Sequence, residues 1–199
     1  MPPNPIFTTL ALLALTTQAH AQWATPQPPQ AGEILILPIP NNFKVASRIS
    51  RNGVNIQEVL PQSQSLDNWS ERITSQVFLN NPNVDPAKFL STMESKWAAA
   101  CPGSAPGQMF AGHVNNFPIA VTFLRCPKNP STGKPENVLV RVISGGSNLY
   151  TVRFAFRYDP VTADISRAAK YLASTQVCDP STPTHPCPQI ENKPPTTWQ

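Results

Sequence analysis

The sequence predicts an α+β fold, a single domain in which an antiparallel sheet is flanked by two helices, between disordered Pro-rich termini. Three observations predict this fold. Short runs of apolar and β-branched residues are typical of strands. Short turn-forming segments between these runs can join only antiparallel neighbours. Two further stretches have helical periodicity. The elements follow one another as strands, helix, strands, helix, an order typical of helices packed on an antiparallel sheet.

The folded part is expected to open with a strand at residues 34–37. Two prolines follow within four residues, and because proline has no backbone N–H to donate, this strand belongs at an edge or at a terminus. The next two runs, 43–50 and 54–60, flank an Asn52-Gly53 pair. Asn-Gly between two alternating runs is the strongest short hairpin signal, so these two runs should pair.

Residues 65–78 fit two interpretations. Trp69, Ile73 and Val77 have the spacing of one face of a helix, whereas alternate residues from Ile73 onward also fit a strand. We predict a turn around Trp69 and then a strand at 72–79, because the pairs Ile-Thr and Val-Phe favour a pleated surface.

The first helix is expected to begin at Asp85, as its N-cap, with Pro86 at its first position. Apolar residues between Phe89 and Trp97 lie on one helical face. The helix should end at the Ala-Cys-Pro-Gly segment of residues 100–103, since proline and glycine stop a helix.

The second half of the chain predicts two strand pairs and a second helix. The first pair is joined through Asn115-Asn116 and the second by the turn 145–148. The last helix carries Ile165 and Leu172 on its apolar face and should end near Thr175. The strands are expected at residues 109–114, 119–125, 137–143 and 149–157.

The N-terminal sequence predicts export. An apolar run at residues 6–17 ends in Ala19-His20-Ala21, the small-x-small pattern that signal peptidase accepts, so residues 1–21 are expected to be a cleaved signal peptide. The run is shorter than the roughly 20 apolar residues of a membrane-spanning helix, and no transmembrane segment is expected in the mature chain. A buried N-terminal strand is the alternative, but the sequence after residue 21 turns abruptly polar and Pro-rich.

The predicted organisation has one folded domain. Removing 21 of the 199 residues leaves 178, a length that suits a single domain with extended ends. We expect a Pro/Gln-rich linker at 22–32 and the α+β domain at 33–178. A Pro-rich tail at 179–199 should be disordered, apart from any loop that Cys178 and Cys187 close.

Four cysteines in an exported chain favour disulfides. Three pairings are possible. We favour Cys101–Cys126 and Cys178–Cys187, because each pair is close in sequence and flanked by turn residues. Free buried thiols are the alternative. A zinc site is disfavoured, since the sequence has no C-x-x-C motif and few histidines.

Composition and motifs disfavour several functions. The net charge is +4 and only 13% of residues are charged, without a Lys/Arg cluster, so we expect no nucleic-acid partner. Neither a phosphate-binding loop nor a nucleophile elbow occurs, and we predict no cofactor, no metal site and no catalytic residue. His113 has no acid near it in sequence and is expected to be structural, and His185 falls in the predicted tail.

Residues 58–76 resemble a poorly characterised group of secreted Gram-negative proteins. The segment places Glu58 and a proline before Trp69-Ser70 and an Ile-Thr-Ser-Gln strand, and a helix ending in Cys101 and the segment Gly146-Ser-Asn-Leu-Tyr150 follow. The order of elements is also similar to the Mog1/PsbP-like fold, an antiparallel sheet flanked by helices. The resemblance implies this fold, no established reaction and no catalytic residue.

Three carboxylates around Trp69 suggest one alternative function. Glu58, Asp67 and Glu71 could provide the acid pair of an envelope glycan hydrolase, with Trp69 stacking on a sugar. Such an enzyme requires two carboxyls that face one cleft. The simpler interpretation makes Asp67 a turn residue, Trp69 a core residue and Glu71 a solvated surface residue.

Three arginines suggest another alternative. Arg141, Arg153 and Arg157 occupy odd-numbered positions of two strands that should be neighbours. If these positions share one face of the sheet, the three guanidinium groups could bind a small anion together. A solvated sheet face is the competing interpretation.

The sequence therefore predicts a secreted or periplasmic domain that is not an enzyme and that binds a protein or a cell-envelope partner. Pro-rich ends suit interaction, because pre-extended segments lose little entropy on docking. A glycan hydrolase and a small-anion carrier are the alternatives. The possible binding residues are Trp69, Arg141, Arg153 and Arg157.

Overall fold

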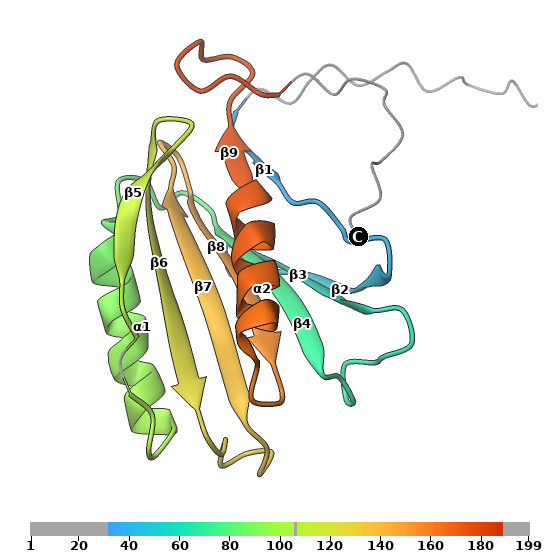
Figure 1. Cartoon of the computed structure of the whole chain (residues 1–199). Coiled ribbons are helices and arrows are strands. Elements are labelled where there is room, and N and C mark those ends of the chain that lie inside the picture. Colours follow the sequence, from blue (N-terminus) through green and yellow to red (C-terminus); the bar gives the residue numbers. More distant parts are fainter. Residues whose placement is uncertain (1–31, 106, 189–199) are drawn as a thin grey trace, which may run out of the picture. The chain divides into compact units, whose positions relative to one another are not determined.

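The computed structural model describes residues 32–105 and 107–188 (Figure 1). The predicted signal peptide at 1–21, nearly all of the predicted linker and the end of the predicted tail lie outside these residues. The elements in chain order are β1 (Ile34–Ile36), β2 (Phe43–Arg51), β3 (Val54–Pro61), β4 (Glu71–Phe78), α1 (Pro86–Ala100), β5 (Phe110–Val114), β6 (Phe117–Cys126), β7 (Glu136–Ser144), β8 (Leu149–Phe156), α2 (Thr162–Ser174) and β9 (Gln176–Cys178).

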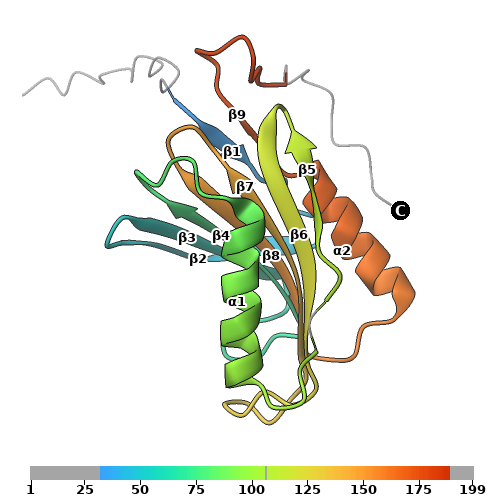
Figure 2. The same cartoon turned by 90° about the vertical axis from the view of Figure 1, so that its left-hand side faces the viewer.

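Seven strands form one sheet in the order β2-β3-β4-β8-β7-β6-β5, and every neighbouring pair is antiparallel. Helix α1 packs on one face over β6 and β7, and α2 packs on the opposite face over β7 and β8 (Figures 1 and 2). We call these the α1 face and the α2 face. The predicted fold class, an antiparallel sheet flanked by two helices, is confirmed.

Local signals in the sequence account for where α1 begins and for the two tightest turns. The Asp85 carboxylate accepts hydrogen bonds from the backbone N–H groups of Ala87 at 2.8 Å and Lys88 at 3.1 Å, as an N-cap does. Both turn residues have positive φ in the β2–β3 hairpin, Asn52-Gly53, and in the β5–β6 hairpin, Asn115-Asn116. Two consecutive positive φ values define the type I′ turn that matches the twist of paired strands.

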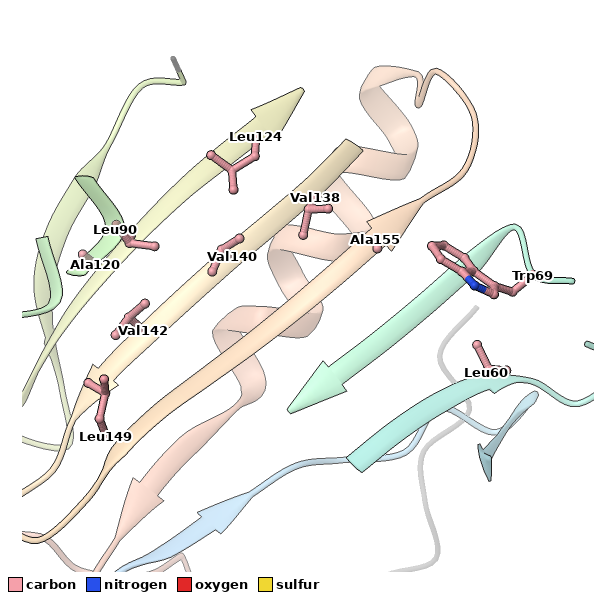
Figure 3. Close-up of a cluster of buried hydrophobic side chains, with 10 residues drawn as sticks. All are labelled: Leu60, Trp69, Leu90, Ala120, Leu124, Val138, Val140, Val142, Leu149 and Ala155. Carbon is pink, nitrogen blue, oxygen red and sulfur yellow. The ribbon is translucent and has the colours of Figure 1, made fainter. Parts of the chain in front are cut away.

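Each face of the sheet has its own buried cluster. On the α1 face, Leu90 of α1 meets Val140 and Val142 of β7, and Figure 3 shows this cluster extending to Leu60 and Trp69. On the α2 face the cluster is aromatic and includes residues of α2; its buried members are Phe43, Val59, Ile73, Leu139, Val152, Phe154, Phe156, Ala168 and Leu172. Both helices are thus held by burial of one apolar stripe against the sheet.

Strand β9 was not predicted. It follows α2 directly and pairs with β1 in a separate two-stranded sheet, where Ile34 lies opposite Cys178. A three-residue strand has almost no signal of its own, because its stability comes from its partner and from the complete burial of Val177. Glu33, just before β1, accepts backbone hydrogen bonds from Ser147 and Asn148 and so ties this sheet to the β7–β8 turn.

Two disulfides join Cys101 to Cys126 and Cys178 to Cys187, with Cα–Cα distances of 5.7 and 4.8 Å. These are the pairings that the sequence favours. The first fastens the end of α1 to the end of β6, and the second closes the loop that follows β9.

The loop at residues 179–188, most of which the Cys178–Cys187 disulfide closes, packs against the β5–β6 turn, and His185 takes part in this packing. The His185 ring stacks on Phe117 with 3.9 Å between centroids, and its Nδ1 donates to the Asn115 carbonyl at 2.8 Å. Asn116 Nδ2 donates to the Thr184 carbonyl at 2.8 Å. These contacts are long-range and leave no periodic pattern in the sequence.

All three tyrosines of the chain should resist ionisation. Burial raises the pKa of Tyr150, Tyr158 and Tyr171 well above the ordinary value of about 10. The neutral phenols therefore contribute stability that is fully present below about pH 10 and is lost as the pH rises further. We expect phenolate absorbance to appear together with loss of circular dichroism on alkaline titration. Phenolate forming near pH 10 with an unchanged dichroism spectrum would contradict this.

Candidate functional site

Two arginines, Arg72 and Arg157, stack on Trp69 on the α1 face, and Arg153 lies on the same face. In β8 and just after it, Arg153, Ala155 and Arg157 alternate onto this face, and the register places Arg72 of β4 opposite Ala155. Arg157 extends the ladder, since its backbone N–H donates to the Ser70 carbonyl at 2.9 Å. We call Trp69, Arg72, Arg153 and Arg157 the Trp69 cluster. Its members come from the loop before β4, from β4, from β8 and from the residue that follows β8.

Trp69 is a core residue that also holds the arginines in place. Its side chain lies over the sheet beside Leu60 and Ala155, with 4% of its surface exposed (Figure 3). The guanidinium carbon of Arg157 is 3.9 Å from the indole centroid and that of Arg72 is 4.3 Å away, both within cation–π range. The indole therefore offers no open platform for a sugar.

Two carboxylates partly neutralise the cluster. Glu58 Oε1 accepts from Arg72 Nη1 at 3.1 Å, and Glu136 Oε1 forms a longer ion pair with Arg72 Nη2 at 3.9 Å. Glu136 also accepts from Asn129 Nδ2 at 2.6 Å. With three arginines against these two glutamates, the group keeps an excess of one positive charge.

The arginines are costly to bury. Burial, followed by repulsion from Arg72, lowers the pKa of Arg153, and burial also lowers the pKa of Arg157. Among the described residues, four buried N–H groups of the cluster have no hydrogen-bond partner: Nε of Arg72, Arg153 and Arg157, and Nε1 of Trp69. A buried donor without an acceptor raises the free energy of the folded state, so an anion near this cluster would stabilise it.

A pocket of about 270 Å³ opens beside the cluster, where the loop before β4 meets the loop before β7. We call it the Trp69 pocket. It combines the cations Lys134 and Arg157 with amide and hydroxyl groups, and no carboxylate lines it. Its lining residues are Gln64, Asn68, Trp69, Ser70, Lys134, Arg157 and Tyr158. Two cations with neutral donors have the chemistry that suits a small anionic group.

A larger hollow of about 660 Å³ lies on the α2 face, between the β1 segment and β2, β3 and β4. Its polar side chains already bind one another: Arg48 donates to Gln57 at 2.8 Å, and Ser50 donates to Asn55 at 2.7 Å. It is therefore a weaker candidate for a polar ligand than the Trp69 pocket.

Arg141 does not belong to the cluster, and the prediction that it shares a face with Arg153 and Arg157 is wrong. It lies opposite Val152 in the ladder, whereas Arg153 lies opposite Val140, so the two arginines point to opposite faces. Arg141 is buried on the α2 face and donates to the carbonyls of Leu172 and Thr175 at the end of α2. The even length of the four-residue turn 145–148 causes this, because it places odd residues of one strand opposite even residues of the next.

The carboxylates of the hydrolase alternative are not brought together. Glu58 binds Arg72 on the α1 face. Glu71 points to the α2 face, where it accepts from Arg167 of α2 at 2.6 Å and from Tyr158 at 2.8 Å. Asp67 is exposed in the loop before β4. Glu58 and Glu71 thus act as partners of separate arginines and cannot flank one scissile bond.

The histidines and acids of the described part form no metal site. His113 is exposed on β5, and His185 lies on Phe117. Across residues 32–105 and 107–188, no group of three or more His, Cys, Asp or Glu side chains could hold a metal ion. Neither of the two helices in these ranges has the length and apolar composition needed to cross a membrane.

Two charged residues of the site were not identified from the sequence. Arg72 lies on the predicted strand after Trp69. Because residues two apart in a strand share a face, Arg72 could have been placed on the same face as Thr74. Lys134 belongs to a turn-rich loop before β7 and reaches the pocket only through tertiary packing, so the sequence contains no pattern that identifies it.

Comparisons with known proteins give a fold-level likeness only. No family model matches the sequence, and no curated protein matches it. The structure is similar to LpqN, involved in cell envelope biogenesis of Mycobacterium tuberculosis, at 15% identity and a TM-score of 0.44, covering 75% of this chain and 86% of LpqN. It is also similar to the Ran-binding protein Mog1p of Saccharomyces cerevisiae, at 8% identity and a TM-score of 0.42, covering 71% and 84% of the two chains. Mog1p is thus among the structures this chain resembles, as its order of elements predicts.

Proposed function

We propose that this chain is an exported, non-enzymatic binding domain for a protein or a cell-envelope partner, and that it recognises this partner by an anionic group seated in the Trp69 pocket. The observation that carries the proposal is the composition of the pocket: Lys134 and Arg157 line it, together with neutral hydrogen-bonding groups and without a carboxylate. Carboxylate and phosphate groups are the common anions of envelope polymers and of proteins.

The geometry of Arg157 supports an anion as the ligand. Its guanidinium is held against the Trp69 ring, so little side-chain entropy is lost when it binds. A planar guanidinium suits the two oxygens of a carboxylate or phosphate, and Lys134 adds a mobile point charge. The Gln64 amide is bonded to Ser70 at 2.7 and 2.8 Å, which fixes the loop that forms the pocket wall.

Export is proposed from two features. Both disulfides are typical of proteins that fold outside the reducing cytoplasm. The second feature is the N-terminal apolar run followed by Ala19-His20-Ala21, which has the pattern of a cleaved signal peptide. The periplasm and the extracellular medium are both oxidising, so the two disulfides fit either location equally.

The binding part is tested by titrating the purified protein with inorganic phosphate and with acetate while backbone amide resonances are recorded by NMR. We expect saturable shifts at residues 64–70 and near Lys134 and Arg157. Replacing Arg157→Gln or Lys134→Gln should weaken binding at least tenfold, since a charge-assisted hydrogen bond contributes about 1.5–3 kcal/mol. The matched control is Arg51→Gln, an exposed arginine at the β2–β3 turn.

The partner is then sought by capture from an envelope extract on the immobilised protein. A partner retained by the unmodified protein and by Arg51→Gln, and lost with Arg157→Gln, supports the proposal. Titrations without saturable shifts at the pocket, or equal loss of the partner with the control, would refute it. The intact mass of the protein in the same preparation should correspond to a chain without residues 1–21, and a mass that includes them would refute the export part.

A further inference from the structure

The seven-stranded sheet has two edges, β2 and β5. An edge strand presents unpaired backbone N–H and C=O groups, and these can pair with another strand unless the sequence prevents it. The two edges of this sheet differ in how well their sequences prevent such pairing.

Strand β2 is protected against pairing. Its ladder with β3 is interrupted by a bulge between Val45 and Ser47, and a bulge twists an edge away from a straight partner. It also carries the cations Lys44, Arg48 and Arg51. Two such strands side by side would bring like charges together.

Strand β5 has none of these protections. The segment Phe110–Val114 has the sequence Phe-Ala-Gly-His-Val, without Lys, Arg, Asp, Glu or Pro, and its ladder with β6 is regular over all five residues. Its first four residues are exposed. Phe110 is 60% exposed and is the one large aromatic side chain of the described residues that stands open to solvent.

The β5–β6 turn determines which backbone groups are free. Val114 and Phe117 close a two-residue type I′ turn, so they form a hydrogen-bonded pair. Hydrogen-bonded and non-hydrogen-bonded pairs alternate along an antiparallel ladder. Gly112 therefore points its backbone groups toward β6, and Ala111 and His113 point theirs outward.

We propose that β5 pairs with β5 of a second copy of this chain, antiparallel and symmetric about Gly112, to form a dimer with a continuous sheet. In this register Ala111 of one copy exchanges hydrogen bonds with His113 of the other, which satisfies the free groups of both strands. The same surface patch is used by both copies, as a two-fold interface requires.

The side chains fit this register. Phe110 lies opposite Val114 of the second copy in a non-hydrogen-bonded pair, where side chains approach most closely. The exposed aromatic ring is thereby covered by an apolar neighbour on the α2 face. Gly112 meets its own counterpart at the symmetry axis, and the space around it is open, since a Cβ placed there meets nothing within 4 Å.

The helices leave room for the second copy. Helix α1 packs over β6 and β7, so α1 and its counterpart would be separated by about four strand spacings, about 19 Å at 4.8 Å each. This exceeds the diameter of about 10 Å that a helix with side chains needs.

A cysteine introduced at the axis tests the register. At Gly112 the two Cα atoms would lie about 4.5–5.5 Å apart, within the range of a disulfide. The described chain contains no free cysteine. We therefore expect Gly112→Cys to give a covalent dimer under mild oxidation. The matched control Ala111→Cys should stay monomeric on a denaturing gel, because the two introduced thiols lie two positions apart across the strands.

The association itself is measured by sedimentation velocity over a range of concentrations. Ala111→Pro removes an outward N–H that the second copy would use, and it leaves the hydrogen bonds between β5 and β6 intact. It should therefore raise the dimer dissociation constant at least tenfold. Gly112→Ala should leave the dissociation constant nearly unchanged. Circular dichroism checks that each variant is folded. A monomer at every concentration, equal cross-linking of both cysteine variants, or a dimer that Ala111→Pro leaves intact would each overturn the proposal.

Discussion

Removing the Cys101–Cys126 disulfide by replacing both cysteines with alanine should lower the free energy of unfolding by about 3.5 kcal/mol. The bond closes a loop over a sequence separation of 25, and a cross-link stabilises chiefly by reducing the entropy of the unfolded chain, with a benefit that grows with loop length. Both cysteines are almost completely buried, at 3% and 1% exposure, so the replacement also loses packing between α1 and β6.

The second disulfide provides the comparison. Cys178–Cys187 spans a separation of only 9, for which the same relation predicts about 2.6 kcal/mol. Urea unfolding followed by circular dichroism gives both values from the shift of the midpoint at a common slope. If the Cys178–Cys187 variant lost more stability than the Cys101–Cys126 variant, the loop-entropy explanation would fail.

Replacing Arg141 with methionine should lower the free energy of unfolding by about 2–3 kcal/mol and leave anion binding unchanged. Arg141 is 4% exposed and donates to Thr175 O at 2.9 Å and to Leu172 O. Helix α2 has no basic residue in its last turn, so this guanidinium compensates for the negative end of the helix. In this variant the Leu172 carbonyl would still accept hydrogen bonds from the backbone N–H and the hydroxyl of Thr175. The Thr175 carbonyl, in contrast, would be left buried and unpaired.

Two measurements separate this structural role from a binding role. Amide hydrogen exchange should speed up at the last turn of α2 in Arg141→Met, while phosphate titration of the Trp69 pocket should match the unmodified protein. Arg51→Met, at an exposed position, controls for loss of one positive charge and should change stability by no more than about 0.5 kcal/mol. Weakened phosphate binding in Arg141→Met with unchanged stability would contradict the assignment.

The elements that sequence reasoning predicted well are those with local chemistry. The Asp85 cap, the Asn52-Gly53 turn and the Asn115-Asn116 turn each require a particular residue type at a particular φ or hydrogen bond, so they can be recognised over a few residues. The fold class followed from these signals. The position of β8 between β4 and β7 could not, because it depends on which apolar faces meet in three dimensions.

The site was predictable only in part. Trp69, Arg153 and Arg157 were named from the sequence. Arg157 stacks on the Trp69 ring, and Arg153 lies on the same face of the sheet. The error on Arg141 was avoidable, since the four-residue turn 145–148 already determines which residues of β7 and β8 share a face. Lys134 was not predictable, because a loop residue reaches a pocket through packing that no periodicity records.

The pairing of β1 with β9 also determines how the domain responds to tension. Ile34 lies opposite Cys178, so the chain before β1 and the chain after β9 leave the two-stranded sheet at the same end. A force that pulls these two points apart first loads the hydrogen bonds of Glu33 to the β7–β8 turn, and it then breaks the hydrogen bonds of the β1–β9 pair one after another instead of all at once. A molecule tethered at one end and pulled at the other would thus yield at Glu33 and then at β1 and β9, while the Trp69 pocket and β5 keep their shape.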